Sequence, residues 1–201
     1  MNIAIFVSGR GSNLKAILDN HELKNVISVK VVCSDNEKCN AIKIAQSYFV
    51  DTFIIPSLND EEKVNSLIKF LEEKEIELIV LAGFLKLIPN SVVSKFENKI
   101  INIHPALLPS FGGKGMYGLN VHKAVFESSA KVSGVTVHFV NSEYDKGKII
   151  AQKCVDISDV KSPEEIADRV LKIEHYLLPY VIKKFAEGKI LINNLRVEIL
   201  D

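Results

Sequence analysis

Short apolar runs alternate with amphipathic stretches over the first hundred residues, and this alternation constrains the fold more than any other feature. The apolar runs predict β-strands at 2–7, 27–33, 49–55, 78–82 and 100–104. The stretches between them predict helices at 13–20, 39–47 and 59–75, with a further short helix after Pro89. Strands that alternate with helices form βαβ units around a parallel sheet. We therefore predict an α/β fold with a Rossmann-like open, mostly parallel sheet and helices on both faces.

The second half of the chain follows a different pattern. Two prolines and four glycines within 105–118 predict a loop. Strands are predicted at 134–140 and 148–155, with a connection at 141–147. A helix is predicted at 163–186, where Ser162 caps, Pro163 opens the first turn and Glu165 completes a capping box. The weak alternation of the tail at 189–200 predicts an edge strand or a hairpin. We expect a single domain over residues 1–201.

Composition argues against several classes of function. The 25 basic residues balance the 25 acidic ones, and no basic cluster interleaves with aromatic residues, which argues against nucleic acid as a partner. No apolar run reaches membrane-spanning length and no signal peptide is recognisable, so we expect no membrane association and a cytoplasmic protein. The three cysteines show no metal-ligand spacing, and we expect reduced, mostly buried thiols and no metal site.

The segment 102–105 predicts an active site. Asn102 and His104 alternate with Ile103 on a strand, so the two polar side chains point the same way. Pro105 places them at the end of the strand, where open α/β sheets bind ligands. Spacing alone leaves a structural role for His104 equally open.

Asp145, in the 141–147 connection, supplies a second group if this loop folds over the strand end. A nearby carboxylate raises the pKa of an imidazole, so we expect His104 to carry a proton at neutral pH. An amide, an imidazole and a carboxylate without a Ser or Cys nucleophile favour direct acyl transfer through an oxyanion. The alternative is that Asp145 is only a turn residue.

The other four histidines are expected to have structural roles. His21 lies in a charged turn and should face solvent. His138 lies within a strand, where a core or sheet-surface role is expected. His122 near a helix start and His175 in the last helix are more often structural than ligand contacts at such positions.

The first strand is followed by a glycine turn, residues 8–13. Its glycines let the backbone approach an anion, and the N–H groups of Gly11, Ser12 and Asn13 at a helix N-terminus can hold a phosphate. Leu14 stands where a dinucleotide fingerprint needs a third glycine, so a phosphomonoester fits better. The alternative is a plain turn in which Ser12 or Asn13 caps the helix.

Residues 81–88 stay apolar beyond the fourth predicted strand. An exposed loop is rarely so hydrophobic, which indicates the wall of a pocket for a flat, partly apolar ligand. The alternative is that these side chains pack under the next helix, and both can hold for alternate residues.

Four segments carry a resemblance to a known family: 8–14, 81–84, 102–111 and 134–140, in the family's order. The chain resembles the formyltransferase family over essentially its whole length, and the glycine turn resembles that of the members of purine biosynthesis. The resemblance implies transfer of a formyl group from 10-formyltetrahydrofolate, a consumed cosubstrate, to the primary amine of phosphoribosylglycinamide. It implies small-molecule substrates and a monomer or homodimer.

The resemblance also assigns residues. Asn102, His104 and Asp145 match the family's catalytic trio. The phosphoribosylglycinamide contacts match Gly11, Ser12, Asn13, Leu171, Lys172, Ile173 and Glu174. The folate contacts match Leu85, Lys86, Leu87, Ile88, Asn102, Asn141, Ser142, Glu143, Tyr144 and Asp145. Two alternatives stay open: a formyltransferase of this fold acting on another amine, such as a nucleotide sugar or aminoacyl-tRNA, or a nucleotide-binding module that has lost turnover.

Overall fold

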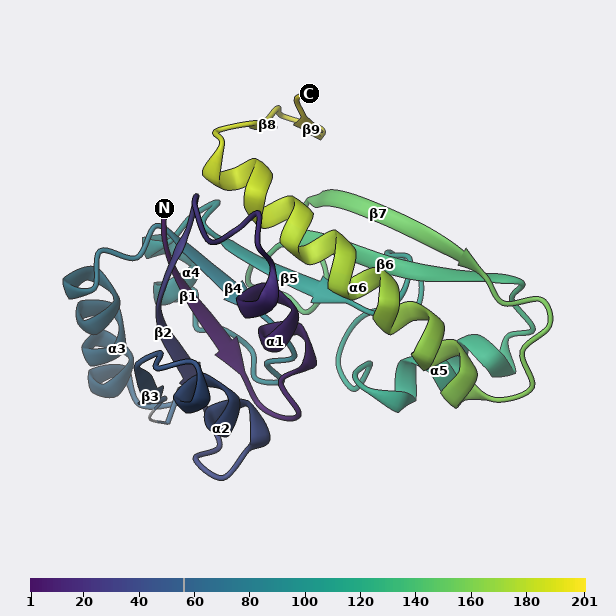
Figure 1. The fold of residues 1–201 in the computed structure, drawn as a ribbon, viewed down its shortest axis with the longest axis horizontal. Helices are drawn as coiled ribbons and strands as arrows, with labels where there is room; N and C mark the ends of the chain where they lie inside the picture. Colours follow the sequence, from purple (N-terminus) through teal and green to yellow (C-terminus); the bar gives the residue numbers. More distant parts are fainter. Residues whose placement is uncertain (56) are drawn as a thin grey trace. The chain divides into compact units, whose positions relative to one another are not determined.

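The computed structural model describes residues 1–55 and 57–201, which fold as two units, 1–102 and 103–201 (Figure 1). The predicted alternation forms the first unit. Its strands are β1 (Asn2–Val7), β2 (Ser28–Ser34), β3 (Thr52–Ile54), β4 (Leu78–Leu81) and the start of β5 (Ile100–His104). Its helices are α1 (Ser12–Asp19), α2 (Asn40–Ser47), α3 (Glu61–Glu73) and α4 (Asn90–Lys95).

The strands of the first unit are parallel and run in the order β3-β2-β1-β4-β5. Right-handed crossovers put α1 and α2 on one face and α3 and α4 on the other. Ile3 to Val7 of the central strand β1 are completely buried, because helices cover both sides of a parallel sheet. The predicted parallel arrangement with helices on both faces is confirmed for this unit.

One predicted strand is too long. The prediction of 49–55 shrinks to β3, Thr52–Ile54, because the residues before it end α2. Phe49 has φ 57° and donates its N–H to the carbonyl of Gln46, and its side chain is 97% exposed. The end of the helix therefore decides the local conformation, against the strand preference of an aromatic residue.

In the second unit, the last residues of β5 are followed by α5 (Leu119–Glu127), β6 (Val132–Phe139), β7 (Ile149–Asp156) and α6 (Pro163–Ala186). β6 and β7 pair antiparallel, and β6 follows the end of β5 in the strand order. Figure 1 shows α6 lying along β6 and β7, with which it is in contact. Residues 105–118 contain neither helix nor strand, as predicted.

The tail forms the predicted hairpin, β8 (Ile190–Ile192) with β9 (Val197–Ile199). α6 begins where the sequence predicts, and the Ser162 hydroxyl accepts the N–H of Glu165 at 3.3 Å. The Glu165 carboxylate accepts the N–H of Lys161, one residue before the capping residue, so the predicted capping box is only half formed. Among the described residues, no helix is long and apolar enough to cross a membrane.

Cys33 and Cys39 are buried and Cys154 is exposed, and all three are free thiols, as expected. The single domain over 1–201 stays a prediction.

Candidate active site

β5 ends in two polar side chains. Asn102 and His104 lie two residues apart and share a face of the strand. Ile103 between them is buried, and so is His104, which is 2% exposed. Asn102 is half-buried. An imidazole therefore sits in a nearly dry environment, with an amide on the same face of its strand.

The structure brings Asp145 to His104, although the two are distant in the sequence. Oδ2 of Asp145 lies 3.6 Å from Nδ1 of His104 and accepts the N–H of Gly113 at 2.9 Å. Burial raises the pKa of the Asp145 carboxyl, but hydrogen bonds from His138 and Gly113 and the nearby imidazoles outweigh it, so that this pKa lies below its usual value. Asp145 has φ 57°, a left-handed conformation that is uncommon outside glycine. The loop therefore presents a charged carboxylate to the imidazole.

The predicted direction of the His104 pKa is wrong. Burial lowers the pKa of His104 by more than the charge of Asp145 and the hydrogen bond to the Phe111 carbonyl raise it, so this pKa lies below 6.5. A carboxylate partner can be inferred from the sequence, whereas the burial that outweighs it cannot. The ring is therefore neutral at neutral pH. Its hydrogen lies on Nε2, because Nε2 is 2.8 Å from the carbonyl oxygen of Phe111, which can only accept.

Two further histidines, for which a structural role was predicted, approach this pair. His138 is buried in β6, as a core role requires, but its Nε2 lies 3.5 Å from Oδ1 of Asp145. His122, on α5, is 6% exposed, and burial together with the nearby His104 lowers its pKa to about 4. A signal for His138 existed: Thr136 and His138 alternate with apolar residues, so two polar side chains share one face of β6.

The 105–118 loop packs against the site. Thr136 Oγ1 accepts the N–H of Leu108 at 3.0 Å and donates to the carbonyl of Ala106 at 2.7 Å. Further along, the Phe111 carbonyl and the Gly113 N–H bond to the His104–Asp145 pair. β6 therefore holds the start of the loop, and the loop in turn covers polar atoms of the pair.

The loop after β6 carries the predicted folate contacts from Asn141 to Asp145. Ser142 and Glu143 are exposed, whereas Asn141 and Tyr144 are half-buried. Oδ1 of Asn141 accepts the N–H of Glu143 at 3.0 Å, an Asx turn that shapes the loop before Asp145. The Asp145 carboxylate of this segment reaches the imidazoles of His104 and His138.

The predicted substrate contacts on α6 separate by helix face. Glu174 is 8% exposed, and Leu171, one turn earlier on the same side, is half-buried. Ile173 is half-buried, and Lys172 points to solvent. A buried carboxylate within an amphipathic helix is the unusual feature of this segment.

In the first unit, the glycine turn opens α1. Gly11 is the N-cap residue with φ 79°, and no side chain caps the helix, so the alternative in which Ser12 or Asn13 caps is wrong. A Cβ on Gly11 would lie 2.8 Å from both Cα and Cβ of Ala41, and the close approach of α1 to α2 therefore requires glycine. The first N–H groups of a helix have no partner within the helix, which leaves backbone donors for an anion.

The turn lies at the point where the strand order reverses about β1, the place where open α/β sheets bind ligands. Ser8 joins it to the segment after β4: its N–H donates to the Gly83 carbonyl at 3.1 Å, and its hydroxyl accepts the N–H of Leu85 at 3.1 Å. The predicted folate contacts Leu85, Lys86 and Leu87 are exposed, whereas Ile88 is buried. Ile88 therefore packs in the core, whereas the pocket wall stays a prediction for the exposed Leu85 and Leu87.

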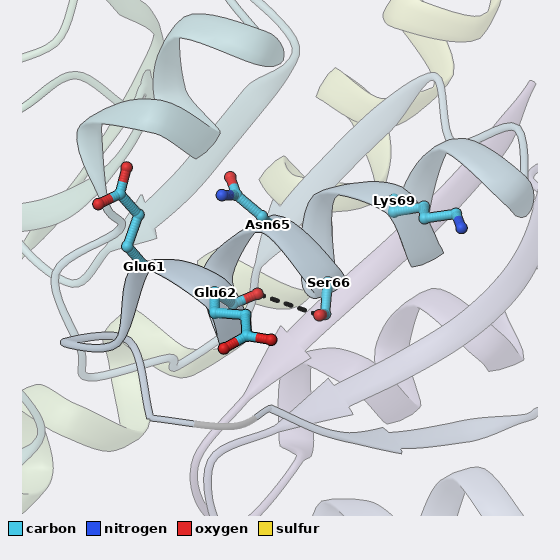
Figure 2. Close-up of a pocket in the computed structure, with 5 residues that line it drawn as sticks. All are labelled: Glu61, Glu62, Asn65, Ser66 and Lys69. Atoms are coloured by element: carbon cyan, nitrogen blue, oxygen red, sulfur yellow. Dashed lines mark hydrogen bonds between the residues drawn. The ribbon is translucent and has the colours of Figure 1, made fainter.

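A hollow on the outer surface of α3 offers no comparable chemistry. Figure 2 shows that its side chains project from one stretch of helix without converging, and the hydrogen bond drawn joins a hydroxyl to a carbonyl one turn away. The five lining residues are all exposed: Glu61, Glu62, Asn65, Ser66 and Lys69. Within 1–55 and 57–201, no three His, Cys, Asp or Glu side chains are arranged to hold a metal ion.

Comparison with known proteins agrees with this architecture. The family described as formyl transferase matches residues 1–182. Phosphoribosylglycinamide formyltransferase of Bacillus subtilis is 36% identical over 90% of this chain and 92% of its own length. The chloroplastic protein of the same name from Arabidopsis thaliana is 42% identical over 94% of this chain. This chain spans 66% of that protein and 62% of the one from Vigna unguiculata.

Among solved structures, phosphoribosylglycinamide formyltransferase from Anaplasma phagocytophilum superposes with a TM-score of 0.90 at 33% identity, covering 100% of this chain and 95% of that one. The resemblance read from four sequence segments is thereby confirmed, and so is the fold class. The chain belongs to the formyl transferase family.

Proposed function

We propose that the protein transfers the formyl group of 10-formyltetrahydrofolate to the primary amine of phosphoribosylglycinamide, a step of purine biosynthesis. The observation that carries this proposal is the Asp145 carboxylate beside His104 at the end of β5, in a member of the formyl transferase family. The names of the relatives support the choice of substrate.

The reaction is a direct transfer. The amine nitrogen attacks the formyl carbon, a C–N bond forms, and the carbonyl oxygen becomes an oxyanion. The attacking nitrogen then loses a proton, and N10 of the folate gains one before its bond to the carbon breaks. The products are the formylated amide and tetrahydrofolate, and the protein keeps no net proton.

Asn102 and His104 are the donors to the oxyanion in this proposal. His104 donates to the oxyanion from Nε2–H of a neutral ring, and not from a protonated imidazole. The Phe111 carbonyl oxygen, 2.8 Å from Nε2, occupies a position suited to a negatively polarised oxygen. Loop 105–118 must therefore release His104 before the formyl oxygen takes that place. Asp145 orders the water that carries the proton from the amine to N10.

The binding residues follow from the same proposal. The backbone at Gly11, Ser12 and Asn13 holds the substrate phosphate. Glu174, with Leu171 and Ile173 beside it, contacts the same substrate, and the solvent-facing Lys172 is the weakest member of this set.

The folate lies against exposed apolar side chains in this proposal, Leu85 and Leu87, and against the 141–145 loop. A consumed cosubstrate needs no resident cofactor. The cytoplasmic location and the monomer or homodimer stay predictions.

A single-turnover assay tests the function. Purified protein in excess is mixed with phosphoribosylglycinamide and 10-formyltetrahydrofolate, and formylated product is followed by chromatography. A nucleotide amino sugar in place of phosphoribosylglycinamide tests the alternative amine. Product with phosphoribosylglycinamide alone supports the proposal. Product only with the other amine, or with neither while the substrate binds, would favour one of the two alternatives.

A further inference from the structure

The loop after His104 begins with a segment that the neighbouring strands hold by hydrogen bonds. The Thr136 hydroxyl, on β6, donates to the Ala106 carbonyl at 2.7 Å and accepts the N–H of Leu108 at 3.0 Å. The side-chain amide of Gln152, on β7, donates to the Leu108 carbonyl at 2.9 Å and to the Thr136 hydroxyl at 3.0 Å. The backbone of Ala106 and Leu108 is thus bound to the β6–β7 pair. The reaction above uses none of these groups.

The Thr136 hydroxyl and the Gln152 amide nitrogen use their full capacity for hydrogen bonds. A hydroxyl offers one hydrogen and two lone pairs, and Oγ1 of Thr136 uses all three. An amide nitrogen offers two hydrogens, and Nε2 of Gln152 has two acceptors. The two residues lie directly opposite each other in the antiparallel pair, so their side chains share a face. Thr136 and Gln152, called the clamp below, therefore form a satisfied network, which favours a single geometry.

The same strands also fit the side chain of Leu107. A Cβ on Gly134 would lie 2.8 Å from Cδ2 of Leu107 and 2.3 Å from the Lys153 carbonyl oxygen, so only glycine leaves this space. Gly134 lies two residues before Thr136 and therefore on the same face of β6. Leu107 packs where another side chain would stand, which gives the clamped segment an apolar contact in addition to its hydrogen bonds.

Burial ends where the clamp ends. Ala106 is completely buried and Leu108 is 5% exposed, whereas Pro109 and Ser110 are exposed. His104 lies between β5 on one side and the clamped residues on the other, so the chain is fixed both before and after it. The part of the loop beyond Leu108 can then release His104, as the proposed reaction requires, without moving the backbone of His104.

Leu108 also supports the residues that contact the His104–Asp145 pair. A Cβ on Gly112 would lie 2.5 Å from Cδ2 of Leu108 and 3.2 Å from Cβ of Asp145, so this glycine packs between the two side chains. The two neighbours of Gly112 bond to the pair, one through its carbonyl and the other through its N–H. A displaced Leu108 would therefore shift groups that contact both members of the pair.

We propose that Thr136 and Gln152 are positioning residues for formyl transfer. The clamp fixes the backbone that follows His104 and holds Leu108 in place, so that the His104 ring and the Asp145 carboxylate keep their alignment. Both clamp residues act through the backbone of the loop and not on the reacting atoms. Their effect on the rate rests on the proposed function, whereas their effect on the geometry of the pair does not.

NMR of the ligand-free protein with 15N-labelled histidine tests the geometry without any activity. Gln152→Met removes the amide donor at an exposed position, where folding should be retained. Cys154→Ala, two residues further along β7 and also exposed, is its matched control. We expect the His104 ring signals, assigned by their loss in His104→Ala, to shift in Gln152→Met and to stay in place in Cys154→Ala. Unchanged His104 signals in Gln152→Met would overturn the proposal.

Steady-state kinetics tests the effect on the rate. Thr136→Val removes the hydroxyl and keeps the shape of the side chain. Ser133→Ala is its matched control, because the buried Ser133 hydroxyl on the same strand has no hydrogen-bond partner among the described residues. In Thr136→Val, kcat should fall on the order of tenfold, less than the roughly hundredfold loss for a misplacement of about 1 Å, with both KM values nearly unchanged. Thr136→Ser, which keeps the hydroxyl, should restore kcat.

A wild-type kcat in Thr136→Val would refute the positioning role, and so would a Thr136→Ser enzyme as slow as Thr136→Val. If Thr136→Val does not fold, Gln152→Met gives the same comparison of kcat and KM. The double variant should be no slower than the slower single variant, because both substitutions act on the backbone of Leu108. Multiplied effects would mean that the two residues do not form one clamp. If the wild type fails to transfer formyl groups, the proposed function fails, and the His104 ring signals still decide the geometry.

Discussion

The glycine turn of the first unit and the histidine cluster of the second, defined as His104, His122, His138 and Asp145, are built in opposite ways. The turn consists of consecutive residues, and its geometry comes from the backbone at one glycine and its contact with α2. The cluster takes its side chains from β5, α5, β6 and a loop. A site made of backbone tolerates most side-chain changes, whereas a site made of buried ionisable groups depends on each of them.

The difference also concerns protons. The donors of the turn are backbone N–H groups, which do not titrate in the working range. In the cluster, burial lowers the pKa of His104 and His122, whereas hydrogen bonds and the nearby imidazoles lower the pKa of Asp145 against the effect of burial. Substitutions should therefore separate the two regions: changes in the cluster should alter rate and pH dependence, and changes in the turn should alter backbone fit.

The largest effect is expected for His104→Ala in the cluster. Removing the Nε2–H donor should lower kcat by about a hundredfold or more, because loss of one oxyanion donor typically does so. The dissociation constants of both substrates, measured by calorimetry, should stay close to those of the wild type. A His104→Ala enzyme that kept most of its turnover would show that the cluster does not carry the chemistry.

A smaller effect is expected for Gly11→Ala in the turn, with Gly9→Ala as the matched control. Gly11 has φ 79° and its added Cβ would meet Ala41, whereas a Cβ on Gly9 meets no atom within 4 Å. Strain of this kind costs about 1–3 kcal/mol of unfolding free energy. Urea unfolding of both variants measures it, and equal stability of the two would mean that the turn does not depend on its backbone.

The same contrast decides what sequence alone could predict. The strands β1, β2, β4 and β5 agree with the predictions to within a residue, because period and turn residues are local signals. The contact of Asp145 with His104 was also predicted. The protonation of His104 was not, since it depends on burial by segments far away in the sequence. His138 was missed although period two placed it beside Thr136, because a lone histidine in an apolar strand is usually part of the core.

The structural role of Gly11 could not be read from the sequence either. A glycine in a first βα turn indicates an anion site by pattern, but its contact with Ala41 is a tertiary feature. An increase in the KM for the ribonucleotide in a Gly11 variant would therefore mix backbone strain with lost phosphate binding. The unfolding free energy of the same variant, measured beside its KM, gives the part that comes from backbone strain.

The smallest effect concerns stability and pH, and it depends on His122. Its pKa is about 4 in the folded chain, against about 6.5 when unfolded, so the unfolded state binds the proton more tightly. The stabilisation is present above pH 6.5 and is lost as the pH falls toward 4. When the pH falls from 7 to 5.5, protonation of this histidine in the unfolded state should lower the free energy of unfolding by about 1 kcal/mol. Most carboxylates stay ionised over this pH range.

His122→Asn removes the titrating ring, and its unfolding free energy should fall by about 1 kcal/mol less than that of the wild type over this window. His175, whose pKa burial also lowers, contributes equally to both proteins and cancels in the difference. His21→Asn, at an exposed position, should behave like the wild type. Urea unfolding at both pH values measures the difference. If the wild type and His122→Asn lost the same amount, His122 would not be held neutral, and the pH dependence of the cluster would come from His104 and Asp145 alone.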